Sequence, residues 1–215
     1  MLQAANMDKT KIAVSVFDKL ADVYQGKFMD VYLYHDSLNN FCKQVPKANA
    51  TILELACGPG NITKYLLSKR PDLDIFGIDL APNMVALAKE NNPNAKFEVM
   101  DCRAIATLRR KYDGIVCGFC LPYLSDIEAE KMIQDAGRLL NYSGILYLST
   151  MEGYYNKSQW ETGSSGDKVF MHYHHADELT RILKKEHFKI ISLERLEYIS
   201  NAKETIDLII IAKKN

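Results

Sequence analysis

Four short stretches combine glycines, acids and small apolar residues in a way that suits ligand binding: ELACGPGN (54–61), GIDLAPNM (77–84), FEVMDC (97–102) and GFCLPYL (118–124). In the first stretch, Gly58 and Gly60 lack the Cβ atoms that would keep a ligand away from the backbone. A helix that begins near Asn61 would add free N–H groups and a positive dipole end. A ligand-free strand-to-helix turn can use the same glycines, so this turn alone is weak evidence.

Two aspartates add more specific hydrogen-bonding chemistry. Asp79 lies 19 positions after Gly60, and its two carboxylate oxygens can accept from both hydroxyls of a vicinal diol such as ribose. Asp101 could accept from the exocyclic amine of adenine, while the backbone N–H of Cys102 donates to a ring nitrogen. Each aspartate could instead cap the helix that follows it. In the fourth stretch, Phe119 and Leu121 could cover a ring and a group donor.

These stretches lie at the ends of predicted strands. The β-rich runs span 51–56, 74–80, 95–101, 112–119 and 144–150, and helical stretches fill 61–70, 82–91 and 125–140. This alternation predicts a parallel sheet with right-handed crossovers. Ligands bind such sheets at the carboxyl ends of the strands, where all four motifs lie.

The two ends of the chain differ from this alternating centre. After a helix over 177–187, strands over 188–199 and 205–213 are joined by only five residues, which requires an antiparallel pair. The segment 151–168 is predicted to be a long loop. Residues 8–45 predict two amphipathic helices laid against the main domain. The first helix is stopped by Gly26, and the second runs from Phe28 to Val45. The apolar face of the first helix comprises Ala13, Val16, Phe17, Leu20 and Tyr24.

Composition narrows the class of protein. The 215 residues include 27 Lys and Arg and 27 Asp and Glu, so no basic excess favours nucleic acid as a partner. No apolar stretch approaches the roughly 18 residues that cross a bilayer, and the N-terminus lacks a signal-peptide core. The five cysteines show no disulfide spacing, which suits a reducing compartment. We therefore expect a cytoplasmic protein with no membrane partner.

The sequence resembles class I S-adenosylmethionine-dependent methyltransferases of the small-molecule subgroup. The resemblance spans roughly residues 48 to 213 and rests on ELACGPGN, GIDLAPNM, FEVMDC and the terminal pair of strands. It implies an α/β, Rossmann-like, mostly parallel sheet in the order 3-2-1-4-5-7-6, with strand 7 antiparallel and helices on both faces. It also implies a helical cap over 1–47, packed on an S-adenosylmethionine-binding domain over 48–215.

The resemblance assigns roles to individual residues. It implies that S-adenosyl-L-methionine is the cofactor and S-adenosyl-L-homocysteine the product. The methionine moiety would contact Glu54, Ala56, Gly58 and Gly60; the ribose would contact Asp79; the adenine would contact Leu80, Met84, Asp101 and Cys102; and the region near the sulfonium would contact Phe119 and Cys120. Tyr24 of the N-terminal cap would also reach the cofactor.

Other enzyme classes fit the same residues less well. A Rossmann dehydrogenase would need glycine at position 63, where Thr63 stands. Cys117 and Cys120 have the spacing of a dithiol redox site, but they end a strand instead of opening a helix. One such pair is too few ligands for zinc, and we predict no metal site. A cofactor-binding protein without transferase activity, such as a sensor or partner subunit, remains an alternative.

The acceptor is expected to be a small molecule held between the N-terminal helices and residues 151–175. Candidate acceptor-binding residues are Tyr154, Trp160, His172 and His174. His175 is expected to cap the helix over 177–187. No catalytic residue is predicted, because a base is needed only if the acceptor must lose a proton. The acceptor atom and the oligomeric state remain open.

Overall fold

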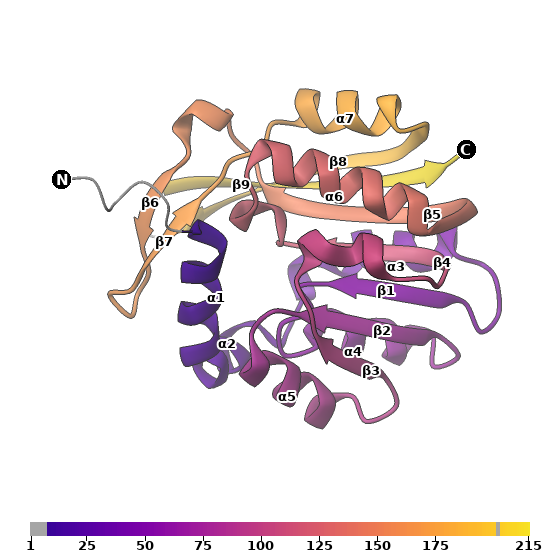
Figure 1. The fold of residues 1–215 in the computed structure, drawn as a ribbon, viewed down its shortest axis with the longest axis horizontal. Helices are drawn as coiled ribbons and strands as arrows, with labels where there is room; N and C mark the ends of the chain where they lie inside the picture. The colour runs from indigo at the N-terminus through magenta and orange to yellow at the C-terminus, as the bar shows by residue number, and fades with distance from the viewer. Residues whose placement is uncertain (1–7, 201–202) are drawn as a thin grey trace.

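A seven-stranded sheet forms the centre of the protein, in the order β3-β2-β1-β4-β5-β9-β8 (Figure 1). The computed structural model describes residues 8–200 and 203–215. Strands β1 to β5 pair in parallel, while β9 is antiparallel to both of its neighbours. The predicted strand order is therefore confirmed, with β8 and β9 as its sixth and seventh strands. The strands are β1 (Thr51–Leu55), β2 (Asp74–Asp79), β3 (Lys96–Val99), β4 (Tyr112–Gly118), β5 (Leu140–Met151), β8 (Phe188–Ser200) and β9 (Lys203–Lys214).

Helices cover both faces of this sheet, as expected for parallel strands that are apolar on both sides. Their bounds are α3 (His35–Gln44), α4 (Asn61–Lys69), α5 (Pro82–Asn91), α6 (Asp126–Leu139) and α7 (Ala176–Lys185), with short 3-10 helices η2 (Cys102–Thr107) and η3 (Leu121–Tyr123). Helices α6 and α7 share one buried apolar cluster with the sheet, and α3 and α4 share another. A capping box formed by Ser125 and Glu128 begins α6.

The N-terminal helices end at other residues than the sequence predicts. Helix α1 (Lys9–Lys19) breaks at Leu20, whose φ of −105° and ψ of 17° leave the helical region. Helix α2 (Ala21–Phe28) then continues through Gly26, so the prediction that this glycine stops the helix is wrong. A glycine inside an exposed helix lowers its stability but does not end it.

The second predicted helix is also shorter than its apolar spacing suggested. A 3-10 turn, η1 (Tyr32–Tyr34), separates α2 from α3, so the single helix predicted from Phe28 to Val45 is wrong in its first half. Helix α3 packs on the sheet, where Leu38 and Phe41 join the buried cluster.

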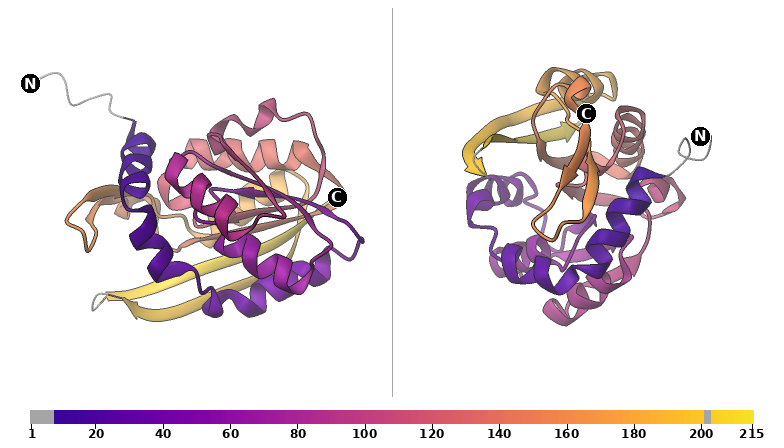
Figure 2. Two further views of the ribbon diagram at one scale, coloured as in Figure 1. Left: turned by 90° about the horizontal axis from the view of Figure 1, so that it is seen from below. Right: turned by 90° about the vertical axis from the view of Figure 1, so that its left-hand side faces the viewer.

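The segment predicted as a long loop contains a small hairpin. After η4 (Tyr155–Lys157), strands β6 (Gln159–Thr162) and β7 (Lys168–Met171) pair antiparallel. Trp160 lies opposite Phe170, and their rings meet edge to face with centroids 5.6 Å apart. Such cross-strand aromatic pairs stabilise short hairpins. The hairpin lies beside α1 (Figure 2).

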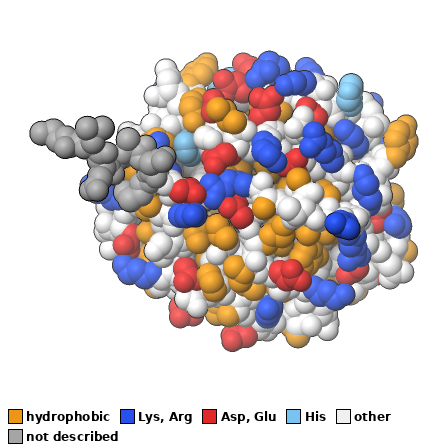
Figure 3. Space-filling view, in the orientation of Figure 1, with side chains coloured by type: hydrophobic (Ala, Val, Ile, Leu, Met, Phe, Trp, Pro, Cys, Tyr) orange, Lys and Arg blue, Asp and Glu red, His pale blue; other side chains and the backbone are white. Residues whose placement is uncertain are grey.

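Acidic and basic side chains are interspersed on the face shown in Figure 3. This distribution fits the equal numbers of both signs in the sequence. Within residues 8–200 and 203–215, no helix is long and apolar enough to cross a membrane.

Candidate cofactor site

A cavity of about 770 Å³, including its part open to solvent, lies at the carboxyl edge of the parallel strands. Its floor comes from the segments that follow β1 to β4, and helices α1 and α2 form its other wall. All but two of the residues predicted to hold a cofactor line this cavity. The lining members of that set are Tyr24, Ala56, Gly58, Asp79, Leu80, Met84, Asp101, Cys102, Phe119 and Cys120.

The two predicted glycines have different surroundings, although both have left-handed backbone conformations. Gly58 (φ 53°) lines the cavity, and a Cβ added there would lie 3.8 Å from the ring of Tyr24. Gly60 (φ 78°) is the N-cap of α4 and lies outside the cavity lining. A Cβ there would collide with the amide of Asn92 and lie 3.3 Å from Ala88. Gly58 thus leaves room in the cavity, whereas Gly60 permits close packing of the turn against α5.

Asp79 closes β2 and is held by backbone N–H groups. Gly58 donates to its Oδ2 and Ala81 to its Oδ1, both at 2.9 Å. Burial raises the pKa of Asp79, although hydrogen bonds from Ala81 and Gly58 oppose this shift. Each oxygen keeps a further lone pair for a hydroxyl of a ligand in the cavity. The aspartate therefore caps the turn before α5 and also faces the cavity.

Glu54 is the second predicted residue outside the cavity lining. It is buried in β1, and its carboxylate accepts a hydrogen bond from the hydroxyl of Thr63. Burial raises the pKa of Glu54 to about 8, with the Thr63 hydrogen bond acting in the opposite direction. In the sequence, Thr63 stands out only as a departure from a dehydrogenase pattern. The structure shows that it is the hydrogen-bond partner of a buried acid.

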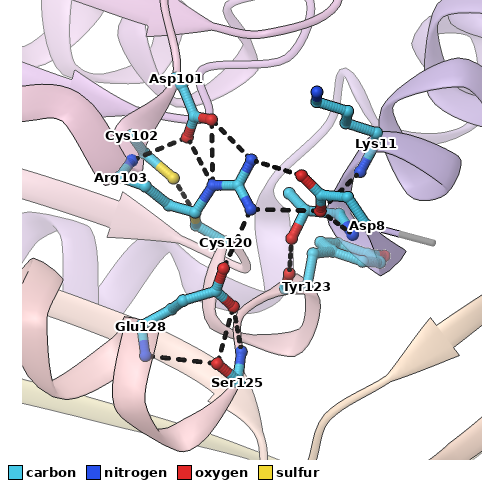
Figure 4. Close-up of polar contacts among 10 residues, drawn as sticks. Asp8, Lys11, Asp101, Cys102, Arg103, Cys120, Tyr123, Ser125 and Glu128 are labelled. Carbon is cyan, nitrogen blue, oxygen red and sulfur yellow. Dashed lines mark hydrogen bonds and ion pairs between the residues drawn. The ribbon is translucent and has the colours of Figure 1, made fainter. Parts of the chain in front are cut away.

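Asp101 and Cys102 follow β3 and also line the cavity. Asp101 is the N-cap of η2 and accepts from the backbone N–H of Arg103 at 2.8 Å, so the predicted capping role is present. The side chain of Arg103 also reaches Asp101, an interaction that the sequence reading missed (Figure 4). The Sγ atoms of Cys102 and Cys120 lie 3.4 Å apart. This contact, together with burial, raises the pKa of Cys102 well above its usual range.

Phe119, after β4, has a strained backbone for a residue with a side chain. Its φ is 52°, and its N–H donates to both the carbonyl and the hydroxyl of Ser149, each at 3.1 Å. The ring of Phe119 packs on that of Tyr34, with centroids 5.2 Å apart. The hydroxyl of Tyr34 in turn donates to the buried carboxylate of Asp207 at 2.8 Å. Leu121, which was expected to cover a ligand, is buried but does not line the cavity.

Helix α1 supplies cavity residues that the sequence reading left in an apolar helix face. Ala13 and Phe17 line the cavity, and the Phe17 ring packs edge to face on Tyr24 and Tyr123. Thr10 fixes the helix by donating to the carbonyl of Tyr123 at 2.9 Å. In the sequence, the apolar face of α1 was the signal for these cavity residues, because it has more residues than packing against one neighbouring helix requires.

The four predicted acceptor residues do not line this cavity. Tyr154 is 60% exposed and Trp160 is 45% exposed. His174 is buried, and its Nε2 lies 2.9 Å from the carbonyl of Leu121. His172 is also buried, and desolvation lowers its pKa to about 4. The predicted cap at His175 is confirmed, because its Nδ1 accepts from the N–H of Asp177.

In the part of the chain that the structure describes, no three His, Cys, Asp or Glu side chains are grouped to hold a metal ion. All five cysteines are free thiols.

The chain is similar to methyltransferases both in sequence and in fold. Residues 52–144 match the family described as "Methyltransferase domain". The chain is 29% identical over 155 residues to "Putative methyltransferase 235L" of Invertebrate iridescent virus 6. This alignment covers 72% of this chain and 51% of that protein. It is 33% identical over 108 residues to a malonyl-[acyl-carrier protein] O-methyltransferase of Acetivibrio thermocellus, covering 48% of this chain and 36% of that protein. The chain thus spans about half the length of the first relative and about a third of the second.

A solved structure shows the same fold over almost the whole chain. The magnesium protoporphyrin IX methyltransferase of Synechocystis PCC 6803, with bound S-adenosylmethionine, superposes with a TM-score of 0.72 at 17% identity, covering 99% of this chain and 100% of that one. Its likeness supports the strand order described above. Residues 52–144 of this chain are thus similar to a methyltransferase domain in sequence, and almost the whole chain has the fold of a solved methyltransferase.

Proposed function

We propose that the protein binds S-adenosylmethionine in the cavity at the carboxyl edge and transfers its methyl group to a small-molecule acceptor. The observation that carries this proposal is the joint placement of Asp79 and Asp101 in one cavity of about 770 Å³. The residues fit the cofactor chemically, because one acid accepts a hydrogen bond from the glycine turn and a second acid lines the same cavity.

The proposed contacts follow the order of these groups along the cavity. The methionine moiety lies along the turn at Ala56 and Gly58, beneath the ring of Tyr24. The turn is supported from outside the cavity by Glu54 and Gly60. Asp79 accepts from the ribose hydroxyls. The remaining contacts are Leu80, Met84, Asp101 and Cys102 for adenine, and Phe119 and Cys120 near the sulfonium.

When bound, S-adenosylmethionine supplies a methyl group on a positively charged sulfur, which the lone pair of an acceptor can displace. The task of the chain is to align the reacting atoms and exclude water, which contributes on the order of 7–11 kcal/mol in well-oriented reactions. The aromatic rings of Phe17 and Tyr24 line the cavity from the side of α1 and α2, and the ring of Tyr123 in η3 packs on Phe17. Phe119, held by Ser149 and packed on Tyr34, is proposed to fix the position of the reacting centre.

The acceptor is proposed to be a small molecule that approaches between helices α1 and α2 and residues 151–175. The β6–β7 hairpin supports this placement, because Lys19 pairs with Asp167 at 3.0 Å and Lys27 donates to Ser164 at 3.1 Å. We propose that the described residues of the segment 1–47 act as a helical cap on the domain over 48–215; residues 1–7 and 201–202 of these two segments lie outside the described residues. The free thiols support a reducing, cytoplasmic compartment.

Thermal unfolding with S-adenosylhomocysteine and with NAD, side by side, tests the cofactor. At 100 times the dissociation constant a ligand stabilises the folded state by about 2.7 kcal/mol, which raises the melting temperature of a domain of this size by roughly 5–10 °C. We expect this rise with S-adenosylhomocysteine and none with NAD. A rise with NAD alone, or with neither ligand, would contradict the proposal. Mass spectrometry of candidate acceptors incubated with the labelled cofactor then tests transfer.

A further inference from the structure

Two thiols meet in the wall of the cavity. Cys102 is the first residue of η2, and Cys120 is the N-cap of η3, 18 positions further along the chain. Their Sγ atoms lie 3.4 Å apart, and both residues line the cavity. Figure 4 shows the contact between the two sulfurs. Transfer of a methyl group to an acceptor involves no reaction at either sulfur, so this pair has no part in the proposed chemistry.

The place of the pair in the fold allows the two sulfurs to join. A disulfide bond is about 2.05 Å long, so the Sγ atoms must approach each other by roughly 1.3 Å. Both residues lie in the segments that follow the strands, outside the hydrogen-bonded ladder of the sheet. A shift of this size therefore leaves the strand pairing intact. Cys117, in contrast, lies in β4, is fully buried and does not line the cavity.

We infer that Cys102 and Cys120 form a reversible disulfide when peroxide enters the cavity, and that this disulfide and the cofactor exclude each other. The second half of the inference rests on the proposed binding of S-adenosylmethionine and concerns the regulation of the same cavity.

The reaction balances with hydrogen peroxide as the oxidant. One thiolate attacks the peroxide, so that an S–O bond forms, the O–O bond breaks and the leaving oxygen departs as water. The second thiol attacks the sulfur of this sulfenic acid, so that the S–S bond forms, the S–O bond breaks and a second water leaves. Two thiols and one peroxide thus give one disulfide and two waters. A free thiol in solution reverses the change by thiol–disulfide exchange.

The surroundings of the thiols make this reaction slow. The contact with Cys120, together with burial, raises the pKa of Cys102 well above its usual range. The hydrogen bond with Cys102 lowers the pKa of Cys120, but Cys117 and burial raise it, and the net pKa is well above its usual range. Since the thiolate is the reactive form, the pair should need an excess of peroxide to react.

Disulfide and cofactor should compete because they involve the same part of the wall. Asp101 and Phe119, the residues directly before the two cysteines, also line the cavity. Closure of the gap between the sulfurs displaces these neighbours, and a bound ligand shields both sulfurs from peroxide. Two such events weaken each other to the same extent, typically by roughly 5- to 150-fold.

Peptide mapping after peroxide treatment tests the disulfide without reference to any ligand. Trypsin separates residues 97–103, which contain Cys102, from residues 112–131, which contain Cys117 and Cys120. We expect mass spectrometry without reduction to find these two peptides linked. Cys42→Ser and Cys117→Ala should keep the linked pair, whereas Cys102→Ser and Cys120→Ser should lose it. A disulfide confined to residues 112–131, or no disulfide, would overturn the inference.

Calorimetry with S-adenosylhomocysteine tests the exclusion. The peroxide-treated wild type should bind roughly 5- to 150-fold more weakly than the untreated protein, and dithiothreitol should restore the affinity. Ligand at 100 times its dissociation constant leaves about 1% of the protein free, so it should slow formation of the linked peptides up to about 100-fold. Unchanged affinity in the linked protein would overturn the exclusion.

The readouts also separate the inference from other causes. If the untreated wild type does not bind S-adenosylhomocysteine, the proposed function fails, while the peptide map still decides the disulfide. If it binds and no linked pair forms, only the inference fails. Dithiothreitol reduces a disulfide but not methionine sulfoxide, so an affinity loss that it does not reverse would assign the effect to a cavity residue such as Met84 and contradict the exclusion. An equal loss in Cys102→Ser would do the same.

Discussion

Glu54 should make the protein less stable as the pH rises towards 8. Its side chain is buried, and burial raises the pKa of Glu54 to about 8 from a usual value of 4.5. At pH 7 the folded state therefore keeps a proton that the unfolded state has lost. Because the folded pKa is the higher one, the stability is fully present below pH 4.5 and is lost between pH 4.5 and 8.

The magnitude follows from the size of this shift. One pKa unit corresponds to about 1.4 kcal/mol, so the loss between pH 4.5 and 7 is about 3 kcal/mol. Glu54→Gln cannot ionise, and its amide oxygen can still accept from the hydroxyl of Thr63. The variant should match the wild type near pH 4.5 and should be more stable by about 3 kcal/mol at pH 7. In melting temperature this gain is roughly 6–12 °C for a domain of this size.

Urea unfolding at several pH values between 5 and 8, followed by circular dichroism, measures this difference. Glu98→Gln provides the control, because Glu98 is an exposed glutamate on β3. The control variant should follow the wild type at every pH. A Glu54→Gln variant that is destabilised, or whose difference from the wild type does not depend on pH, would refute the reasoning. Glu54 would then be ionised in the folded protein despite its burial.

Three further predictions concern the cavity and its surroundings. Asp79→Ala should weaken binding of S-adenosylhomocysteine roughly 100-fold or more in calorimetry, because two hydrogen bonds to a charged group are lost. The circular dichroism spectrum of this variant should remain that of a folded protein. Gly60→Ala should lower the free energy of unfolding by about 1–3 kcal/mol, because the new Cβ collides with Asn92. Gly26→Ala should raise the free energy of unfolding by about 1 kcal/mol, because no atom lies within 4 Å of the new Cβ. Chemical denaturation measures both changes. Desolvation lowers the pKa of His172 to about 4, so the protein should lose stability as the pH falls from 6.5 towards 4. The expected loss is about 2 kcal/mol at pH 5. A His172→Phe variant whose free energy of unfolding depends on pH as that of the wild type does would contradict this prediction.

Most of the fold could be predicted from local patterns in the sequence. Strands and helices alternate between residues 51 and 151 in a regular apolar pattern, and each motif follows directly on its strand. Since parallel strands end at the same edge of a sheet, the sequence alone predicted that Asp79 and Asp101 lie at one edge, and both line the cavity there. The antiparallel tail followed from the short connection between its strands, which no parallel crossover can make.

The wrong predictions share a different origin. The break at Leu20 and the continuation of the helix through Gly26 depend on what α1 and α2 pack against, which local spacing does not reveal. The β6–β7 hairpin has turn-forming residues that resemble those of a loop. Its contact with the helices joins Lys19 to Asp167, 148 positions apart in the chain.

The sequence by itself determined the class of fold and the edge of the sheet at which ligands bind, because both depend on periodicity and on residues next to one another in the chain. Only the tertiary structure decided which side chains face the cavity. It placed Glu54 outside the lining, added Phe17 to it, and brought Arg103 to Asp8 across 95 positions. The physical reason is that burial and ion pairing arise where distant segments meet, and spacing along one segment does not encode such meetings.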